Sequence, residues 1–212
     1  MGLPAFDVML ISDTGPHLPT RAERVLRDLP PGRVALQLRR RDLSAGALLE
    51  LAHVLRAVTR AYGACFLVND RVDVAIASGA DGVQLPEGSF TPGAARALLG
   101  TAACIGASRH DVAGIAATGD ASFVLVSPVF AVPGKGQPLG FDGLRTLVRA
   151  SPRPVYALGG LDSRHVTTLL STGVRGLATI RAVWDAPDPA AALSDLVFAF
   201  PAQVVAAPGV QG

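Results

Sequence analysis

The stretch "VYALGGLD", residues 155–162, is a short apolar run that ends on the glycine pair Gly159–Gly160. The residues after it, "DSRHVTTLLSTG" (162–173), have helical spacing, with Asp162 as a cap candidate at the start and Gly173 suited to a left-handed cap at the end. This junction has two readings. The glycines form a tight turn, or they leave bare backbone N–H groups to face an anion.

The same strand–helix unit recurs along the chain. Short apolar runs typical of buried parallel strands occupy residues 6–12, 33–38, 64–68, 82–85, 102–107, 122–127, 154–158 and 175–180. Helical spacing lies between them, most clearly in 44–63, which Ser44 can cap, and in 91–100, which runs from Thr91 to a left-handed cap at Gly100.

Eight such units are the number that a (β/α)₈ barrel requires, so we predict an α/β protein with a single-domain (β/α)₈ TIM barrel. We place the barrel at residues 1–204 and a C-terminal tail at 205–212. An open doubly wound sheet is the alternative fold, but it usually has fewer strands and carries its glycine fingerprint after the first strand. Here the glycine pair follows the seventh strand.

The composition limits the choice of partners. Of 212 residues, 50% are hydrophobic and 17% are charged, and the net charge of +2 gives no general reason to expect nucleic acid. We found no signal peptide and no long apolar run, so we expect no membrane span and a cytoplasmic location. Cys65 and Cys104 lie far apart in apolar runs, and we expect both to be buried packing thiols in a reducing compartment.

In a barrel of this kind the chemistry lies at the carboxyl ends of the strands. The polar residues at those positions are Gln37, Arg39, Arg41, Asn69, Asp70, Arg71, Gln84, Glu87, Ser108, His110, Ser127 and Lys135. The loops after the seventh and eighth strands commonly form a phosphate site, which favours the anion reading of Gly159–Gly160. Arg39, Arg41 and Lys135 indicate a second anion site across the barrel mouth. The alternative for "RRRD" (39–42) is a solvated surface run.

Several motifs together resemble a known family. They are "VALQLRRRDLS" (34–44), "FLVNDRVDVAIASGADGVQL" (66–85), "IGASRH" (105–110), "LVSPVF" (125–130), "PLGFDGL" (138–144) and "VYALGGL" (155–161). In this order they resemble the thiamine phosphate synthase and thiazole tautomerase family, whose members are (β/α)₈ barrels. The resemblance implies an enzyme that joins hydroxymethylpyrimidine pyrophosphate to thiazole phosphate, with Mg²⁺ as cofactor. Pyrophosphate leaves first, and the thiazole nitrogen then captures the pyrimidine-methyl cation.

The resemblance also implies roles for individual residues. Gln37, Arg39, Asn69 and Lys135 match the pyrophosphate side, and Arg41 stands where lysine is usual. Asp70 matches a Mg²⁺ ligand, and Ser108 matches a serine near the reacting centre. Gly159, Gly160 and the backbone of Ile180 and Arg181 match the thiazole phosphate site. His110 is the acid–base candidate, and its alternative is a histidine near a helix cap without chemistry.

The chain also departs from the synthase pattern. Ser89 stands where synthases have a second Mg²⁺ carboxylate, and Glu87, two residues earlier, is a candidate to replace that acid. Val132 and Gly134 replace threonines that hold the thiazole phosphate. Three functions stay open: a Mg²⁺-dependent synthase, a metal-independent thiazole tautomerase, and a non-catalytic thiamine-phosphate-binding protein. The sequence does not decide the oligomeric state, and a homodimer is one option.

Overall fold

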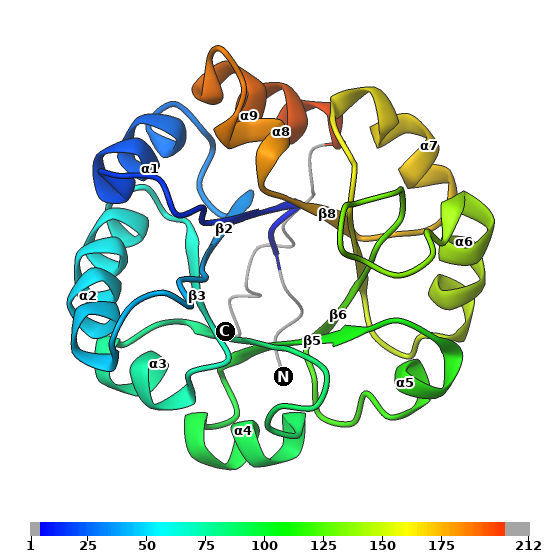
Figure 1. The fold of residues 1–212 in the computed structure, drawn as a ribbon, viewed down its shortest axis with the longest axis horizontal. Coiled ribbons are helices and arrows are strands. Elements are labelled where there is room, and N and C mark those ends of the chain that lie inside the picture. Colours follow the sequence, from blue (N-terminus) through cyan, green and yellow to red (C-terminus); the bar gives the residue numbers. More distant parts are fainter. Residues whose placement is uncertain (1–4, 202–212) are drawn as a thin grey trace, which may run out of the picture.

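The computed structural model describes residues 5–201, and eight parallel strands in it close into a barrel (Figure 1). The strands are β1 (Val8–Ile11), β2 (Val34–Leu38), β3 (Cys65–Asn69), β4 (Gly82–Leu85), β5 (Cys104–Arg109), β6 (Phe123–Val126), β7 (Val155–Leu158) and β8 (Gly176–Thr179). Each strand falls on one of the eight predicted apolar runs, although β5 begins two residues later and extends further than its run. The predicted (β/α)₈ barrel is confirmed.

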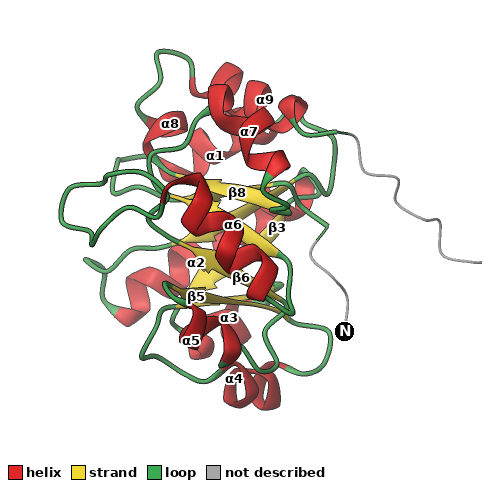
Figure 2. Ribbon diagram, turned by 90° about the vertical axis from the view of Figure 1, so that its right-hand side faces the viewer, coloured by secondary structure: helices red, strands yellow, loops and turns green. Residues whose placement is uncertain are grey.

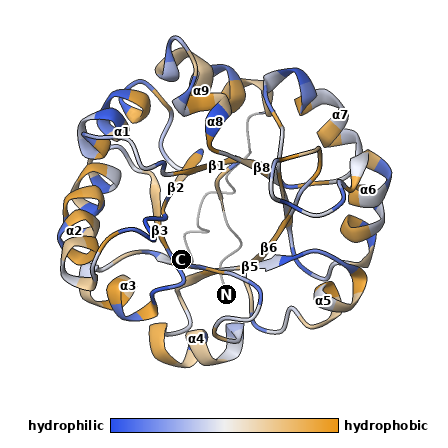
Figure 3. Cartoon of the chain, in the orientation of Figure 1, coloured by the Kyte–Doolittle hydropathy of each residue, from blue (hydrophilic) through white to orange (hydrophobic). Residues whose placement is uncertain are grey.

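Helices surround this barrel as an outer ring (Figures 1 and 2). They are α1 (Leu18–Leu26), α2 (Ala45–Ala61), α3 (Val72–Ser78), α4 (Pro92–Leu99), α5 (Val112–Ala116), α6 (Gly140–Ala150), the 3₁₀ turn η1 (Ser163–His165), α7 (Val166–Ser171), α8 (Arg181–Trp184) and α9 (Pro189–Ala199). Figure 3 shows hydrophilic and hydrophobic residues mixed along these helices, as expected where one face is buried.

The predicted helix caps are mostly confirmed. The Ser44 hydroxyl accepts a hydrogen bond from the Ala47 N–H, and Asp162 accepts one from Arg164. The stretch after Asp162 starts as a 3₁₀ turn and becomes α-helical only at Val166. The left-handed cap expected at Gly100 is wrong, because its φ of 86° is combined with an extended ψ of 172°.

Each strand pairs with the next one in the sequence, and the first strand closes the ring. Val8 of β1 lies opposite Val34 on one side and Leu177 on the other. Parallel pairing throughout brings the carboxyl ends of all the strands to one end of the barrel. The loops that follow the strands therefore form a common mouth.

The apolar core has two layers. One lies between the strands and the helices, and the other fills the barrel itself with side chains such as Met9, Leu67 and Leu125. At the amino end of the barrel, the rings of Phe6, Phe123 and Tyr156 contact one another with centroids 4.8–5.5 Å apart. A filled interior makes the barrel a rigid support for the mouth.

The two cysteines differ in part from the prediction. Both are free thiols, but they are partly exposed rather than fully buried, and together they line an open cavity of about 460 Å³ at the amino end. The pKa of the Cys65 thiol is raised well above its ordinary value, mainly by a hydrogen bond with Cys104 and, to a smaller extent, by burial. Residues far apart in sequence meet here because β3 and β5 flank the same strand.

No helix within residues 5–201 is long and apolar enough to cross a membrane. The predicted boundary at residue 204 and the predicted tail lie outside the described residues.

Candidate active site

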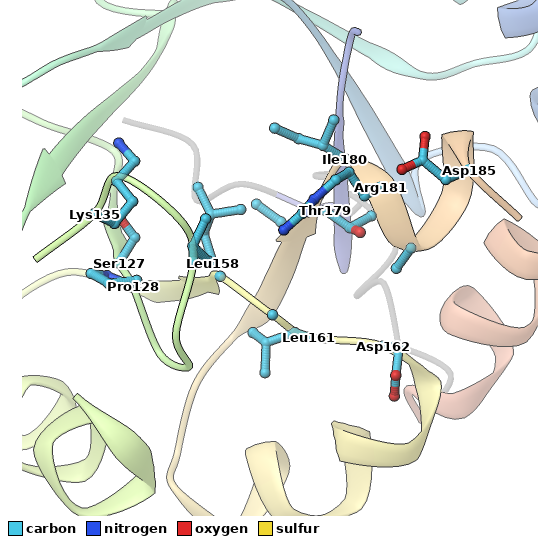
Figure 4. Close-up of a pocket in the computed structure, with 15 residues that line it drawn as sticks. Ser127, Pro128, Lys135, Leu158, Leu161, Asp162, Thr179, Ile180, Arg181 and Asp185 are labelled. Atoms are coloured by element: carbon cyan, nitrogen blue, oxygen red, sulfur yellow. The ribbon is translucent and has the colours of Figure 1, made fainter. Parts of the chain in front are cut away.

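A pocket of about 330 Å³ opens among the carboxyl ends of β6, β7 and β8. Its lining includes five of the residues to which the sequence assigned a role in the site, namely Lys135, Gly159, Gly160, Ile180 and Arg181. Figure 4 shows Lys135 on one side of this pocket and Ile180 and Arg181 on the other. The barrel thus brings the β6 loop and the turns after β7 and β8 together, although we had assigned Lys135 to the opposite anion site.

The glycine pair after β7 is required by the turn itself. Gly159 and Gly160 have φ angles of 114° and 69°, a region that side chains with a Cβ rarely adopt. A Cβ on Gly160 would lie 2.9 Å from Cβ of Phe130, and one on Gly159 would lie 3.0 Å from Pro128. A side chain at Gly160 would therefore disturb the turn and its packing against Phe130 as well as obstruct a bound anion.

The backbone around this pocket nevertheless offers donors. Among the described residues, the N–H groups of Gly160, Leu161, Arg181 and Ala182 donate to no acceptor. These groups belong to the turn after β7 and to the first residues of α8, and all four residues line the pocket. Unpaired N–H groups beside Lys135 and Arg181 are features of a phosphate site. Asp162 and Asp185 also line the pocket, so its charge is mixed.

The arginines after β2 divide into two kinds. Arg40 is engaged with Asp42 through two hydrogen bonds of 2.8 and 2.6 Å, and this contact lowers the pKa of Asp42 to about 2. Burial, together with the nearby charge of Arg41, lowers the pKa of Arg39. Neither Arg39 nor Arg41 forms an ion pair with any described residue. An anion bound between them would relieve their mutual repulsion.

Polar side chains inside the barrel lie just beneath this mouth. The amide Nε2 of Gln37 donates to Oδ1 of Asn69 at 2.9 Å, and Nε2 of Gln84 donates to Oγ of Ser108 at 3.1 Å. Both glutamines are buried, with relative exposures of 1% and 2%. The predicted residues Gln37, Asn69 and Ser108 therefore face one interior space.

Asp70 lies in the turn directly after β3. Its φ of 66° is unusual for a residue other than glycine, and its N–H donates to the Gln84 carbonyl oxygen at 2.9 Å. The Ser89 hydroxyl donates a short hydrogen bond to Oδ1 of Asp70. The position where synthases carry a second acid is thus directly beside the Asp70 carboxylate.

Glu87 faces away from this pair and toward the loop after β5. Its carboxylate lies 3.9 Å from Nε2 of His110. The other ring nitrogen of His110, Nδ1, donates to the carbonyl oxygen of Ser127 at 2.6 Å. His110 therefore ties the β5 loop to the end of β6, next to the pocket that Ser127 lines.

Comparison with known proteins decides the family. The profile described as thiamine monophosphate synthase matches residues 8–183 of this chain. The chain belongs to the thiamine monophosphate synthase family. The thiamine-phosphate synthase of Moorella thermoacetica is 36% identical over 197 residues, which cover 90% of this chain and 93% of that protein. The thiamine-phosphate synthase of Archaeoglobus fulgidus is 38% identical over 182 residues, which cover 83% of each protein.

A solved structure supports the same assignment. The thiamine phosphate pyrophosphorylase from Pyrococcus furiosus superposes with a TM-score of 0.81 at 31% identity, covering 92% of this chain and 96% of that one. The family predicted from the sequence motifs is confirmed.

This thiamine monophosphate synthase family member also has mouth residues that we did not select from the sequence. The Ser12 hydroxyl accepts a hydrogen bond of 2.8 Å from the N–H of Arg39 and so holds the start of the arginine segment. Asp185 follows α8 and lines the pocket near Arg181. Ser12 directly follows β1, and that position was the available signal. For Asp185 there was no such signal, because an acidic side chain is not expected beside an anion.

Proposed function

We propose that the protein is a thiamine-phosphate synthase, a transferase of thiamine biosynthesis that joins hydroxymethylpyrimidine pyrophosphate to thiazole phosphate. The carbon–oxygen bond to pyrophosphate breaks and its electron pair stays on the leaving oxygen. The thiazole nitrogen then gives its lone pair to the pyrimidine-methyl carbon, yielding thiamine phosphate. The observation that carries the proposal is the family match over residues 8–183. Arg39 and Arg41, which form no ion pair with any described residue at the carboxyl end of the barrel, support it.

Positively charged side chains at the barrel mouth stabilise the leaving pyrophosphate in our proposal. Negative charge grows on the leaving group as the bond breaks, so cations fixed at that point stabilise the transition state more than the ground state. Arg39 and Arg41 supply this charge in our proposal, with Lys135 reaching from the β6 loop. Gln37 and Asn69 complete the substrate contacts below them.

The turn after β7 and the start of α8 hold the thiazole phosphate in our proposal. The free N–H groups of Gly160 and Arg181 donate to its oxygens, and the Arg181 side chain adds positive charge. Val132, where family members have a threonine that holds this phosphate, lacks a hydroxyl. Backbone donors therefore carry more of the recognition here.

The described residues fit a Mg²⁺ ion that shares its ligands with the substrate. Within residues 5–201, no cluster of three or more His, Cys, Asp or Glu side chains could hold a metal. Asp70 offers one carboxylate and Ser89 one hydroxyl, and magnesium commonly binds one or two carboxylates together with substrate phosphates and water. When bound, the ion would neutralise charge on the pyrophosphate.

His110 has no necessary proton to move in this reaction, because the thiazole nitrogen attacks through its lone pair. Its hydrogen bond to Ser127 supports a structural role instead. Ser108, in contrast, lies in the interior space below the mouth and is our candidate beside the reacting centre. The partners are small phosphorylated molecules rather than nucleic acid. We further propose a cytoplasmic location.

The test is to incubate the protein with both substrates, with and without Mg²⁺, and to measure pyrophosphate and thiamine phosphate. We expect both products with Mg²⁺ and neither without it. Turnover of a thiazole carboxylate phosphate without metal would instead identify a tautomerase. Binding of thiamine phosphate without any turnover would identify a binding protein.

A further inference from the structure

Gln84 is a buried polar residue to which the proposed reaction assigns no role. It lies on β4 with its side chain inside the barrel, and its amide Nε2 donates to Oγ of Ser108 on β5. Its amide oxygen, Oε1, is buried and has no hydrogen-bond partner among the described residues. A buried amide that is only half satisfied is unfavourable, so its retention requires a reason.

The neighbouring strand makes room for this amide. Gly106 lies opposite Gln84 in the β4–β5 register, two residues before Ser108. A Cβ at Gly106 would overlap Oε1 of Gln84 and the ring of Phe123. Gly106 is not among the glycines with positive φ, so space, rather than an unusual backbone angle, accounts for it. The barrel interior is therefore shaped to seat the Gln84 amide next to Ser108.

The contact fixes what the Ser108 hydroxyl can do. A serine hydroxyl has one O–H donor and two acceptor lone pairs. Because the Gln84 N–H occupies a lone pair of Ser108, the O–H of Ser108 must point elsewhere. It donates to no described residue, so it remains available to a bound molecule.

We propose that Gln84 is a positioning residue, which holds the Ser108 hydroxyl as a donor toward the oxygen that leaves with pyrophosphate. The inference rests on the proposed synthase reaction. Without the Gln84 amide, the Ser108 hydroxyl rotates freely and spends part of its time turned away from the leaving oxygen. The transition state then loses a directed hydrogen bond as the negative charge develops.

A second glutamine provides a matched control. Gln37 on β2 has the same arrangement, with its Nε2 bonded to Asn69 and its Oε1 unpaired among the residues described. It is equally buried, and its side chain forms no hydrogen bond with Ser108. Replacing it removes a comparable amide from the same interior without touching the Ser108 hydroxyl.

A double-mutant cycle on kcat tests the proposal. We expect Ser108→Ala to lower kcat about tenfold, the effect of losing one directed hydrogen bond. Gln84→Met should lower kcat by a smaller factor of about three, because the freed hydroxyl still points at the leaving oxygen in one of its staggered positions. The double variant should be no slower than Ser108→Ala alone, because both changes remove the same interaction. In the control pair, the fold-losses in kcat of Gln37→Met and Ser108→Ala should multiply in the double variant. Multiplied effects for the Gln84 pair, while wild type is active, would overturn the proposal.

Gln84→Glu gives a second readout if Gln84→Met folds poorly. An ionised glutamate can only accept a hydrogen bond, so it would turn the Ser108 O–H away from the substrate, whereas a protonated glutamate can donate as the amide does. The kcat of Gln84→Glu relative to wild type should therefore rise as the pH falls. A pH-independent ratio would contradict the positioning role. A wild type that releases no pyrophosphate would instead refute the synthase function itself.

Discussion

Two charged groups of residues at opposite ends of the barrel differ in how far they are paired. At the amino end, Asp7 is 1% exposed and bonds to both Arg33 and Arg175, the latter at 2.8 Å. At the carboxyl end, Arg39 and Arg41 form no ion pair within residues 5–201, and the side chain of Asp70 receives only the Ser89 hydroxyl. Charges that are satisfied inside the protein stabilise the fold, and charges left unsatisfied are available to a ligand.

At the amino end, the Arg33 guanidinium has hydrogen-bond partners in addition to the Asp7 carboxylate. The Arg33 guanidinium donates to the carbonyl oxygens of Val197 and Phe200 at 2.8 and 3.1 Å, in addition to Asp7. These bonds tie the residue just before β2 to the C-terminal end of α9. Through Arg33, Asp7 at the entry to β1 is thus linked to the C-terminal end of α9.

The largest effect should come from removing the paired carboxylate of Asp7 at the amino end. Asp7→Asn leaves Arg33 and Arg175 partly buried without a counter-charge, so the free energy of unfolding should fall by about 3–5 kcal/mol. Urea unfolding measures this loss. Asp142→Asn is the control, because it breaks an ion pair with Arg145 at 2.6 Å whose acid is 99% exposed. The control should lose less than about 1 kcal/mol, and equal losses would show that burial is not the cause.

The next largest effect should come from removing the Asp70 carboxylate at the carboxyl end. Asp70→Asn removes the carboxylate that we assign to the metal, so kcat should fall at least about 100-fold. The unfolding midpoint in urea should change little, because only the Ser89 hydroxyl bonds to this side chain among the described residues. A variant that keeps its rate would exclude Asp70 from the reaction. One that simply unfolds would place Asp70 with the amino-end charges instead.

The fold was largely predictable from the sequence. Buried parallel strands are continuous apolar runs, and eight such runs with helical spacing between them specify the barrel. The predictions that were wrong concern single turns and side chains rather than the fold. The spacing that predicts a helix at 162–173 does not distinguish a 3₁₀ turn from an α-helix at Ser163–His165. Cys65 and Cys104 meet only because of strand order, which distance along the sequence does not reveal.

The site was predictable as a set of positions but not as a set of contacts. Residues at the carboxyl ends of strands must gather at the mouth, so Gln37, Asp70 and Ser108 could be selected from sequence. The direction of a loop side chain depends on backbone angles such as the positive φ at Asp70. Whether Ser89 or Glu87 reaches that carboxylate therefore depends on the backbone path of the loop after β4, which the residue pattern does not specify.

A third prediction concerns the geometry of the unpaired cations. Arg39→Lys keeps the charge but loses the planar fork that binds two phosphoryl oxygens, so the KM for the pyrimidine pyrophosphate should rise about tenfold. Steady-state kinetics at fixed Mg²⁺ measures it. Arg40→Lys is the control, since Arg40 is paired with Asp42 and should change KM less than about twofold. Equal shifts would mean that charge alone matters in this segment.

A smaller effect is expected from adding a second carboxylate beside Asp70 at the carboxyl end. Ser89→Asp places a second carboxylate beside Asp70, and it should raise Mg²⁺ affinity about tenfold while increasing any synthase rate. In wild type, calorimetry should detect no Mg²⁺ binding at millimolar metal until pyrophosphate is added. Tight binding to the wild-type protein alone would contradict a site that shares its ligands with the substrate.

The smallest effect should come from Glu87→Gln. Glu87 is the other acid that could replace the lost metal carboxylate, but it faces His110 at 3.9 Å, while Ser89 is the residue that contacts Asp70. Its side chain is 51% exposed, so its ion pair with His110 contributes little. Glu87→Gln should therefore change kcat and Mg²⁺ affinity less than about twofold, measured in the same assays as Asp70→Asn. A loss as large as that of Asp70→Asn would mean that Glu87 swings to the metal when substrate binds, and Ser89→Asp should then bring no gain.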